Sequence, residues 1–129
     1  IALALVATMV FLPRWVRRLK AKPMPDVEAL KRQLDAGADV LVLDVRGASE
    51  FTGEGGHIPG ARNLALEDLP SRMAELEDRK QRAIRLVCRT DRRSTQAAQL
   101  LLDAGFTDAQ PVSGGMTAWQ AKGWPTTRF

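Results

Sequence analysis

Cys88 is the only cysteine of the 129-residue chain, and three cations follow it within five residues: Arg89, Arg92 and Arg93. The thiolate is the nucleophilic form of cysteine, and neighbouring arginines stabilise that form. A buried structural cysteine is the alternative, because free cysteines are among the most buried side chains. A buried structural cysteine rarely has three cations nearby, so this stretch favours a nucleophilic role for Cys88.

The segments around Cys88 predict where it lies. An apolar run at Ile84–Val87 predicts a strand before it, and Thr95–Ala104 predicts a helix after it. The start of a helix leaves backbone N–H groups unpaired, and these can bind an anion or stabilise a thiolate. One cysteine rules out an internal disulfide and a four-cysteine zinc site, and it fits a reducing compartment. We predict no metal and no organic cofactor.

The rest of the chain predicts an α/β fold. Val40–Val45 is apolar and rich in β-branched residues, as in a strand that is buried on both faces of a parallel sheet. Strands that alternate with helices form mainly parallel sheets, whose sites lie beyond the carboxyl ends of the strands. The other predicted elements are helices at Asp26–Ala36, Leu66–Leu76 (interrupted near Pro70) and Met116–Lys122, and short strands at Arg62–Leu64 and Ala109–Val112.

Residues 1–22 predict a membrane anchor with a basic flank, followed by a domain at residues 23–129. Ile1–Leu12 reads IALALVATMVFL, and Trp15 and five cations follow before Pro23. Twelve helical residues span about 18 Å, less than the roughly 30 Å hydrocarbon core, so we expect further residues upstream of Ile1. A buried first helix of the domain is the alternative. Cations after the apolar run predict a bacterial inner membrane with the domain facing the cytoplasm.

The charge is unevenly distributed. The chain carries a formal charge of +4, but five of its cations precede Pro23 and all fifteen acidic residues follow it. The domain therefore carries fourteen cations and fifteen acids, a balance of −1. Only 5% of the residues are aromatic. A nearly neutral domain with few aromatic side chains is not typical of nucleic-acid binding, and we predict no nucleic-acid partner.

Four motifs occur in a familiar order. They read LDVR at residues 43–46, GHIPGA at residues 56–61, CRTDRRS at residues 88–94 and SGGMTAW at residues 113–119. Together they resemble a single-domain rhodanese of the sulfurtransferase family, over roughly residues 25–125. The resemblance implies a five-stranded parallel sheet with helices on both faces, here preceded by the apolar N-terminal helix.

The resemblance also implies an activity. Thiosulfate or a persulfide donor would give a sulfane sulfur to Cys88, and the resulting persulfide would pass it to a thiol or to cyanide. Arg89, Thr90, Asp91, Arg92 and Arg93 would form the loop that cradles the sulfur. No cofactor is implied, and the partners would be a small sulfur-containing anion and an acceptor thiol.

Within the loop, Arg89 and Arg92 are candidates for binding the sulfonate of thiosulfate, because guanidinium groups pair well with oxyanions. Arg93 would point either at the sulfur or outward to an acid. We expect Ser94 to cap the following helix, and as a loop residue it could also offer its hydroxyl to the substrate loop. Asp91 stands where the family usually has glycine, and we predict that it points out of the loop mouth and pairs with an arginine.

Three further residues are predicted to be structural and near the site. Asp44 and Arg46 follow a predicted strand and would order the loops through an ion pair, with Glu50 as a further partner. His57 is the only histidine and invites a general-base role. Its glycine- and proline-rich surroundings favour a hydrogen bond that shapes a turn.

Two other functions compete with the sulfurtransferase. Phosphatases related to the cell-division-cycle enzymes share the rhodanese fold, but their loop has five residues between cysteine and arginine. Here Arg93 comes one residue earlier, so the loop suits a sulfur atom better than a phosphoryl group, which also weakens an arsenate-type activity. The second competitor is a catalytically weak, membrane-tethered module that binds a partner or carries sulfur.

Overall fold

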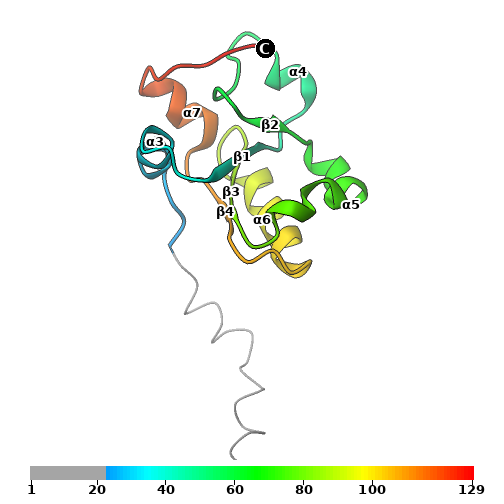
Figure 1. The fold of residues 1–129 in the computed structure, drawn as a ribbon. Coiled ribbons are helices and arrows are strands. Elements are labelled where there is room, and N and C mark those ends of the chain that lie inside the picture. Colours follow the sequence, from blue (N-terminus) through cyan, green and yellow to red (C-terminus); the bar gives the residue numbers. More distant parts are fainter. Residues whose placement is uncertain (1–22) are drawn as a thin grey trace, which may run out of the picture.

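A parallel sheet lies at the centre of the domain in the computed structural model, which describes residues 23–129. Its order is β2-β1-β3-β4, with β1 at Val40–Asp44, β2 at Arg62–Asn63, β3 at Ala83–Val87 and β4 at Ala109–Pro111 (Figure 1). The two inner strands, β1 and β3, are paired over five residues each. Their near-continuous apolar sequences fit strands that are covered on both faces.

Helices cover both faces of the sheet, as the sequence predicts. On one face, α3 (Val27–Asp35) and α7 (Gly115–Ala121) form a core cluster with Val42 and Val87. On the other face, α5 (Leu69–Arg72) and α6 (Arg92–Asp103) pack on Leu43 and Leu86. The remaining elements are α4 (Ala48–Phe51) and two 3₁₀ segments, η1 (Leu66–Asp68) and η2 (Met73–Arg79).

The prediction of five strands is wrong for the described part of the chain, which has four. Beyond β4 there is only an isolated parallel bridge between Asp26 and Ser113, where the Ser113 N–H donates to the Pro25 carbonyl at 2.7 Å. Pro23 and Pro25 have no N–H group to donate. The segment beside β4 therefore makes a single bridge and no regular ladder.

The predicted apolar N-terminal helix and membrane anchor fall on residues 1–22, which lie outside the described residues. From residue 23 onward, no helix combines the length and the apolar character that crossing a bilayer requires.

Two predicted helices differ from the observed ones in ways that affect the argument. The Leu66–Leu76 segment is divided into η1, α5 and η2. α6 begins at Arg92, three residues before the predicted start at Thr95. The earlier start places Arg92, Arg93 and Ser94 inside the first turn of α6, directly after the Cys88 loop.

Candidate active site

Cys88 follows the last residue of β3 and lies at the base of the loop that leads into α6. The residue is 1% exposed and belongs to the core cluster beneath α6. Its Sγ also has polar neighbours, because the Ser94 N–H donates to it at 3.4 Å and the Ser94 Oγ lies 3.5 Å away. The burial fits a structural cysteine, whereas the polar contacts on the loop side fit a reactive one.

The backbone amides of the loop are available to bind an anion. Among residues 23–129, no acceptor pairs with the N–H groups of the five consecutive residues 89–93. These amides include the first turn of α6, where the helix itself provides no acceptor. The loop therefore offers five free donors in the residues that directly follow Cys88.

The start of α7 determines which way these amides face. The Met116 N–H donates to the Cys88 carbonyl at 2.8 Å, and the Thr117 N–H donates to the Arg89 carbonyl at 3.0 Å. In a trans peptide the N–H points away from the C=O. Because α7 holds the carbonyls of Cys88 and Arg89, the N–H groups that follow them face away from α7.

Gly115 makes this close approach possible. A Cβ atom at residue 115 would collide with the Cys88 carbonyl oxygen and would lie 2.6 Å from the Thr90 carbonyl oxygen. Its φ of +48° is also a conformation that side chains disfavour. Thr90, which the sequence places in the loop, is exposed and contributes its carbonyl to this contact.

The predicted pairing of Asp91 with an arginine is wrong. Asp91 is exposed, its Oδ1 accepts the Gly114 N–H at 2.8 Å, and among the described residues it has no ion-pair partner. Its φ is −131°, so the loop does not need glycine here. The charge of Asp91 therefore lies at the start of α7 without an arginine to neutralise it.

The three arginines divide into two groups. Arg93 turns outward and forms two hydrogen bonds with the Glu50 carboxylate, at 2.6 and 3.1 Å. That contact raises the pKa of Arg93, and the charge of Asp44 adds to the effect. Arg89 and Arg92 are exposed, and neither forms an ion pair within residues 23–129. Only these two remain free to meet an incoming anion.

Ser94 does not cap α6, contrary to the prediction. The cap position belongs to Asp91, and Ser94 is the third residue of the helix. Its hydroxyl donates to the Asp91 carbonyl at 3.0 Å, and the side chain is fully buried against the sulfur. Ser94 therefore links the thiol to the loop.

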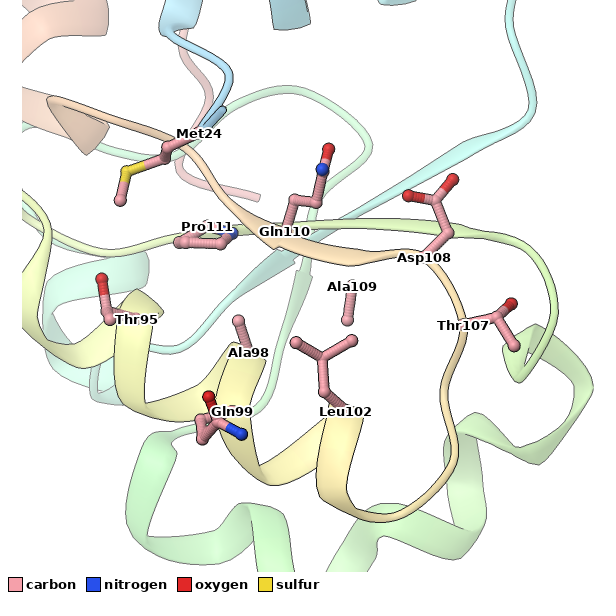
Figure 2. Close-up of a pocket in the computed structure, with 10 residues that line it drawn as sticks. All are labelled: Met24, Thr95, Ala98, Gln99, Leu102, Thr107, Asp108, Ala109, Gln110 and Pro111. Carbon is pink, nitrogen blue, oxygen red and sulfur yellow. The ribbon is translucent and has the colours of Figure 1, made fainter. Parts of the chain in front are cut away.

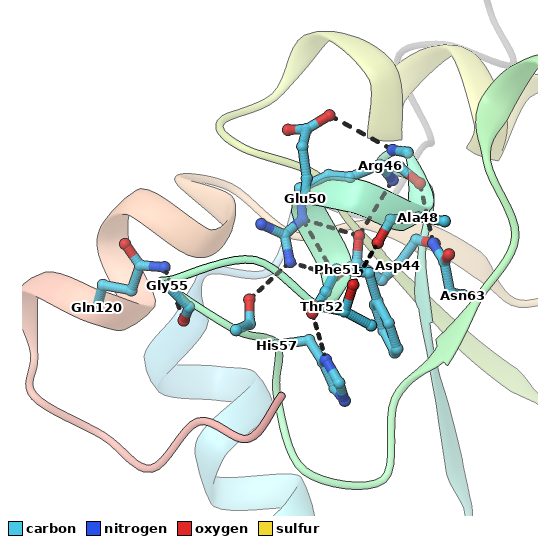
Figure 3. A network of polar contacts seen from close by, with 12 residues as sticks. Asp44, Arg46, Ala48, Glu50, Phe51, Thr52, Gly55, His57, Asn63 and Gln120 are labelled. Carbon is cyan, nitrogen blue, oxygen red and sulfur yellow. Dashed lines mark hydrogen bonds and ion pairs between the residues drawn. The ribbon is translucent and has the colours of Figure 1, made fainter. Parts of the chain in front are cut away.

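Asp44 and Arg46 form a buried ion pair at the carboxyl end of β1 (Figure 3). The Arg46 Nη2 donates to Asp44 Oδ2 at 2.8 Å and to the Gly56 carbonyl at 2.9 Å. Asn63 donates to the carbonyls of both residues, a role that the sequence analysis missed because nothing near Asn63 in the sequence signals it. Together these contacts hold the loop after β1 against β2.

His57 is 1% exposed, and its ring lies between two carbonyl groups. Its Nδ1 is 2.6 Å from the Phe51 carbonyl oxygen, and its Nε2 is 3.0 Å from the Phe129 oxygen. The ring also stacks on Phe51. With both nitrogens engaged in this way, His57 joins α4 to the end of the described chain and has no free nitrogen for a substrate. No three His, Cys, Asp or Glu side chains of residues 23–129 are grouped to hold a metal ion.

Comparison with known proteins places this geometry in a family. The model of the rhodanese-like domain matches residues 26–122. A sulfurtransferase of Allochromatium vinosum is 35% identical over 100 residues, which cover 78% of this chain and 90% of that protein. The thiosulfate sulfurtransferase GlpE of Pseudoalteromonas translucida is 35% identical over 83 residues, 64% of this chain and 75% of the relative.

A solved structure agrees with the sequence comparison. The Alr3790 protein of Anabaena superposes with a TM-score of 0.69 at 38% identity, over 78% of this chain and 77% of that one. Some relatives are longer, and the chain covers 50% of the slr1261 protein of Synechocystis. With Cys88 between a parallel strand and a loop of free amides, and with sulfurtransferases among its relatives, the chain belongs to the rhodanese-like domain family.

Proposed function

We propose that this protein is a sulfurtransferase that carries a sulfane sulfur on Cys88. The free amides at residues 89–93, directly after Cys88 in the chain, are the observation that carries the proposal. Such donors stabilise negative charge on a thiolate and, one atom further out, on a persulfide. A buried structural cysteine would need no such donors.

The donor step follows from these contacts. The Cys88 thiolate attacks the outer sulfur of thiosulfate, a new S–S bond forms, and sulfite leaves with the electron pair of the broken bond. Arg89 and Arg92, the two loop arginines without an acidic partner in the described chain, would bind the sulfonate oxygens. A persulfide donor would enter the same step with a thiolate as the leaving group. An acceptor thiol, or cyanide, then removes the outer sulfur from Cys88.

Intact-mass analysis of the full chain after incubation with thiosulfate, or with a small persulfide, tests the proposal. We expect the mass to rise by one sulfur atom, and the gain to vanish in Cys88→Ala. A subsequent thiol should return the mass to its starting value. If neither donor adds sulfur to the folded protein, the proposal fails and a partner-binding module becomes the better interpretation.

We also propose that residues 1–22 anchor the protein in the bacterial inner membrane, with the domain in the cytoplasm. The apolar run followed by Trp15 and five cations supports this from the sequence alone. Cell fractionation of the full chain tests the idea. We expect the protein in the membrane pellet after an alkaline wash, and a variant that lacks residues 1–22 in the soluble fraction. Full-length protein released by the wash would contradict it.

A further inference from the structure

A polar cavity of about 470 Å³ lies beside the Cys88 loop. Its walls are α4 with the glycine-rich segment after it, the first turns of α7, and Arg89. Met116 and Thr117 line it as well, and their amides hold the carbonyls of Cys88 and Arg89. The cavity therefore adjoins the loop that would carry the transferred sulfur, and a role for it in catalysis rests on the function proposed above.

A second hollow, between α6 and β4, is a poorer candidate for a substrate site. It measures about 510 Å³, and its wall is mainly apolar, with Ala98, Leu102, Ala109 and Pro111 among its lining residues (Figure 2). No cysteine, histidine or cation of the described chain lines it. Nothing in the described structure indicates what would cover it.

The charges around the polar cavity leave one group of each sign without a partner. Arg46 is neutralised by Asp44, and Glu50 is neutralised by Arg93. Arg89 and Glu54 also line the cavity, and within residues 23–129 neither of them forms an ion pair or a side-chain hydrogen bond. The two free charges come from different walls of the cavity, since Glu54 belongs to the segment after α4 and Arg89 to the Cys88 loop.

We propose that this cavity is the acceptor site, and that it prefers a small thiol with both a carboxylate and an ammonium group, as in an amino-acid thiol. Arg89 would bind the carboxylate through paired N–H donors, and Glu54 would bind the ammonium group. The volume falls in the range of small-molecule sites, roughly 300–1,000 Å³. A thiol without these charges would enter the same cavity but leave Arg89 and Glu54 without partners.

The transfer step balances with the acceptor alone. The persulfide anion first takes a proton from water and becomes Cys–S–SH. The acceptor thiolate then attacks its outer sulfur and forms a new S–S bond. The bond between Cys88 Sγ and the outer sulfur breaks, and Cys88 leaves as a thiolate. The proton stays on the transferred sulfur, so the product is a persulfide of the acceptor and no further oxidant or reductant is needed.

The test separates acceptor recognition from donor recognition. Cys88 is first loaded with sulfur, excess donor is removed, and the rate of sulfur discharge is measured by intact mass. The acceptors are cysteine, 3-mercaptopropionate, cysteamine and 2-mercaptoethanol, compared at equal thiolate concentration. Cysteine carries both charged groups, 3-mercaptopropionate carries only the carboxylate, cysteamine carries only the ammonium group, and 2-mercaptoethanol carries neither. We expect discharge in the wild-type protein to be fastest with cysteine and slowest with 2-mercaptoethanol.

Two variants assign the charges. Arg89→Gln should slow discharge about tenfold more with cysteine and 3-mercaptopropionate than with cysteamine and 2-mercaptoethanol. Glu54→Gln should slow cysteine and cysteamine by about threefold to tenfold, with the other two thiols unchanged. Arg32→Gln and Glu67→Gln remove exposed charges on α3 and η1 and serve as matched controls. Arg89→Lys keeps the charge and should retain part of the carboxylate preference.

The outcomes distinguish the two proposals. If Cys88 takes up no sulfur from any donor, the sulfurtransferase proposal itself fails. If Cys88 is loaded but the wild-type protein discharges at equal rates to all four thiols, the acceptor-site proposal is overturned. Equal slowing of all four thiols in Arg89→Gln or in Glu54→Gln would also overturn it. Discharge to a protein thiol alone would overturn it too, because the acceptor would then be a macromolecule.

Discussion

A cysteine in a protein core normally has only apolar neighbours, whereas the sulfur of Cys88 has the amide and the hydroxyl of Ser94 within 3.5 Å. One side of Cys88 packs on Leu86 and Ala97 in the core cluster beneath α6. The other side meets the amide of Ser94 in the first turn of α6. The thiol therefore has one apolar side in the core and one polar side at the start of α6.

Ser94→Ala removes the hydroxyl next to the sulfur but keeps the backbone N–H contact. The Ser94 hydroxyl donates to the Asp91 carbonyl and accepts from the Cys88 thiol, and it can rotate to donate to the sulfur once the thiol is ionised. We therefore expect the rate of sulfur loading on Cys88 to fall about tenfold, in line with the loss of one hydrogen bond to a charged group. Stopped loading reactions followed by intact mass measure this rate. Ser71→Ala is a matched control, since the Ser71 hydroxyl also donates to the carbonyl three residues earlier, at 3.1 Å, but on α5. Equal loading rates in the Ser94→Ala variant and the wild type would contradict this role.

Asp91→Asn keeps an oxygen that can accept the Gly114 N–H and removes the negative charge. Because no arginine neutralises Asp91 in the described structure, we expect kcat/KM for thiosulfate to rise about threefold to tenfold at low salt, a modest Coulomb effect for an exposed charge. The gain should shrink as salt is added. Asp103→Asn, at the other end of α6, should change nothing. A fall in kcat/KM would mean that the charge itself assists the reaction.

For single residues, the sequence predicts the reactive side chain better than it predicts the contacts of the residues around it. Cys88 and its arginines lie within six consecutive residues, so their proximity needs no fold. Gly114, the partner of Asp91, is 23 residues away, and no local pattern connects the two. The sequence left two orientations open for Arg93, toward the sulfur or outward to an acid. Its contact with Glu50, 43 residues earlier in the chain, selects the outward one.

Among the helices, α7 has the most direct influence on the loop, although it contributes no reactive group. Its first turn donates to the carbonyls of Cys88 and Arg89, and its cap residue donates to Asp91. The orientation of the loop amides thus depends on how closely α7 can approach. The absence of a side chain at Gly115 sets that distance.

Gly115→Ala should reduce the free energy of unfolding by about 2–5 kcal/mol, the sum of a disfavoured positive φ and an overpacked contact with backbone. Gly123→Ala is the matched control, because Gly123 also has a positive φ, of 71°, but nothing lies within 4 Å of its added Cβ. That variant should lose only about 1–2 kcal/mol. Urea unfolding of both variants measures the difference. Equal losses would show that α7 does not press on the loop.

The ion pair between Glu50 and Arg93 joins α4 to α6, and its contribution to stability should depend on pH. Hydrogen bonds from Arg93 hold the pKa of Glu50 below its ordinary value of 4.5. The pair therefore adds stability above pH 4.5, and loses it as the pH falls through the lowered pKa. Both side chains are partly exposed, so we expect at most about 1 kcal/mol.

Glu50→Gln tests this dependence. Urea unfolding at neutral pH should show the variant to be slightly less stable than the wild type, and the difference should disappear in acid, where the wild-type Glu50 is also protonated. Glu67→Gln, an exposed position without an ion pair in the described chain, is the control. A difference that persists at low pH would show that the pair does not act through the charge of Glu50.

The sequence predicted the cores of the elements and missed several ends. Val40–Val45 and Ile84–Val87 coincide with β1 and β3 to within one residue, because continuous apolar runs mark doubly covered strands. The start of α6 was missed by three residues, since the polar first turn at residues 92–94 carries no apolar periodicity. Contacts across the fold fix that turn, and such contacts leave no local signal.

For the molecule as a whole, the buried pair of Asp44 and Arg46 lies where β1, β2 and the loop after β1 meet. Asp44→Asn should reduce the free energy of unfolding by about 3–5 kcal/mol, because it leaves the Arg46 charge buried without its partner. Asp39→Asn is the control, since Asp39 pairs with Arg79 and Arg82 at an exposed position and should cost less than about 1 kcal/mol. Thermal and urea unfolding compare the two. Similar losses would mean that the buried pair is not essential to the fold.

The overall architecture was largely predictable, apart from one edge of the sheet. Alternating strands and helices predict a parallel sheet with two covered faces, and the structure has both. The expected fifth strand came from the family resemblance, whereas this chain has Pro23 and Pro25 beside β4 and makes one bridge there. The cavity between α4 and α7 was not predicted, because these two helices lie more than sixty residues apart in sequence.

The solitary, enclosed position of Cys88 has a consequence for the fate of a captured sulfur. The chain has no second cysteine, so it cannot release that sulfur by closing an internal disulfide. At 1% exposure, the inner sulfur is also shielded from bulky oxidants. The sulfur-loaded protein should therefore persist until an external nucleophile removes the sulfur. The lifetime of the loaded protein in the cell would report how much of that nucleophile is available.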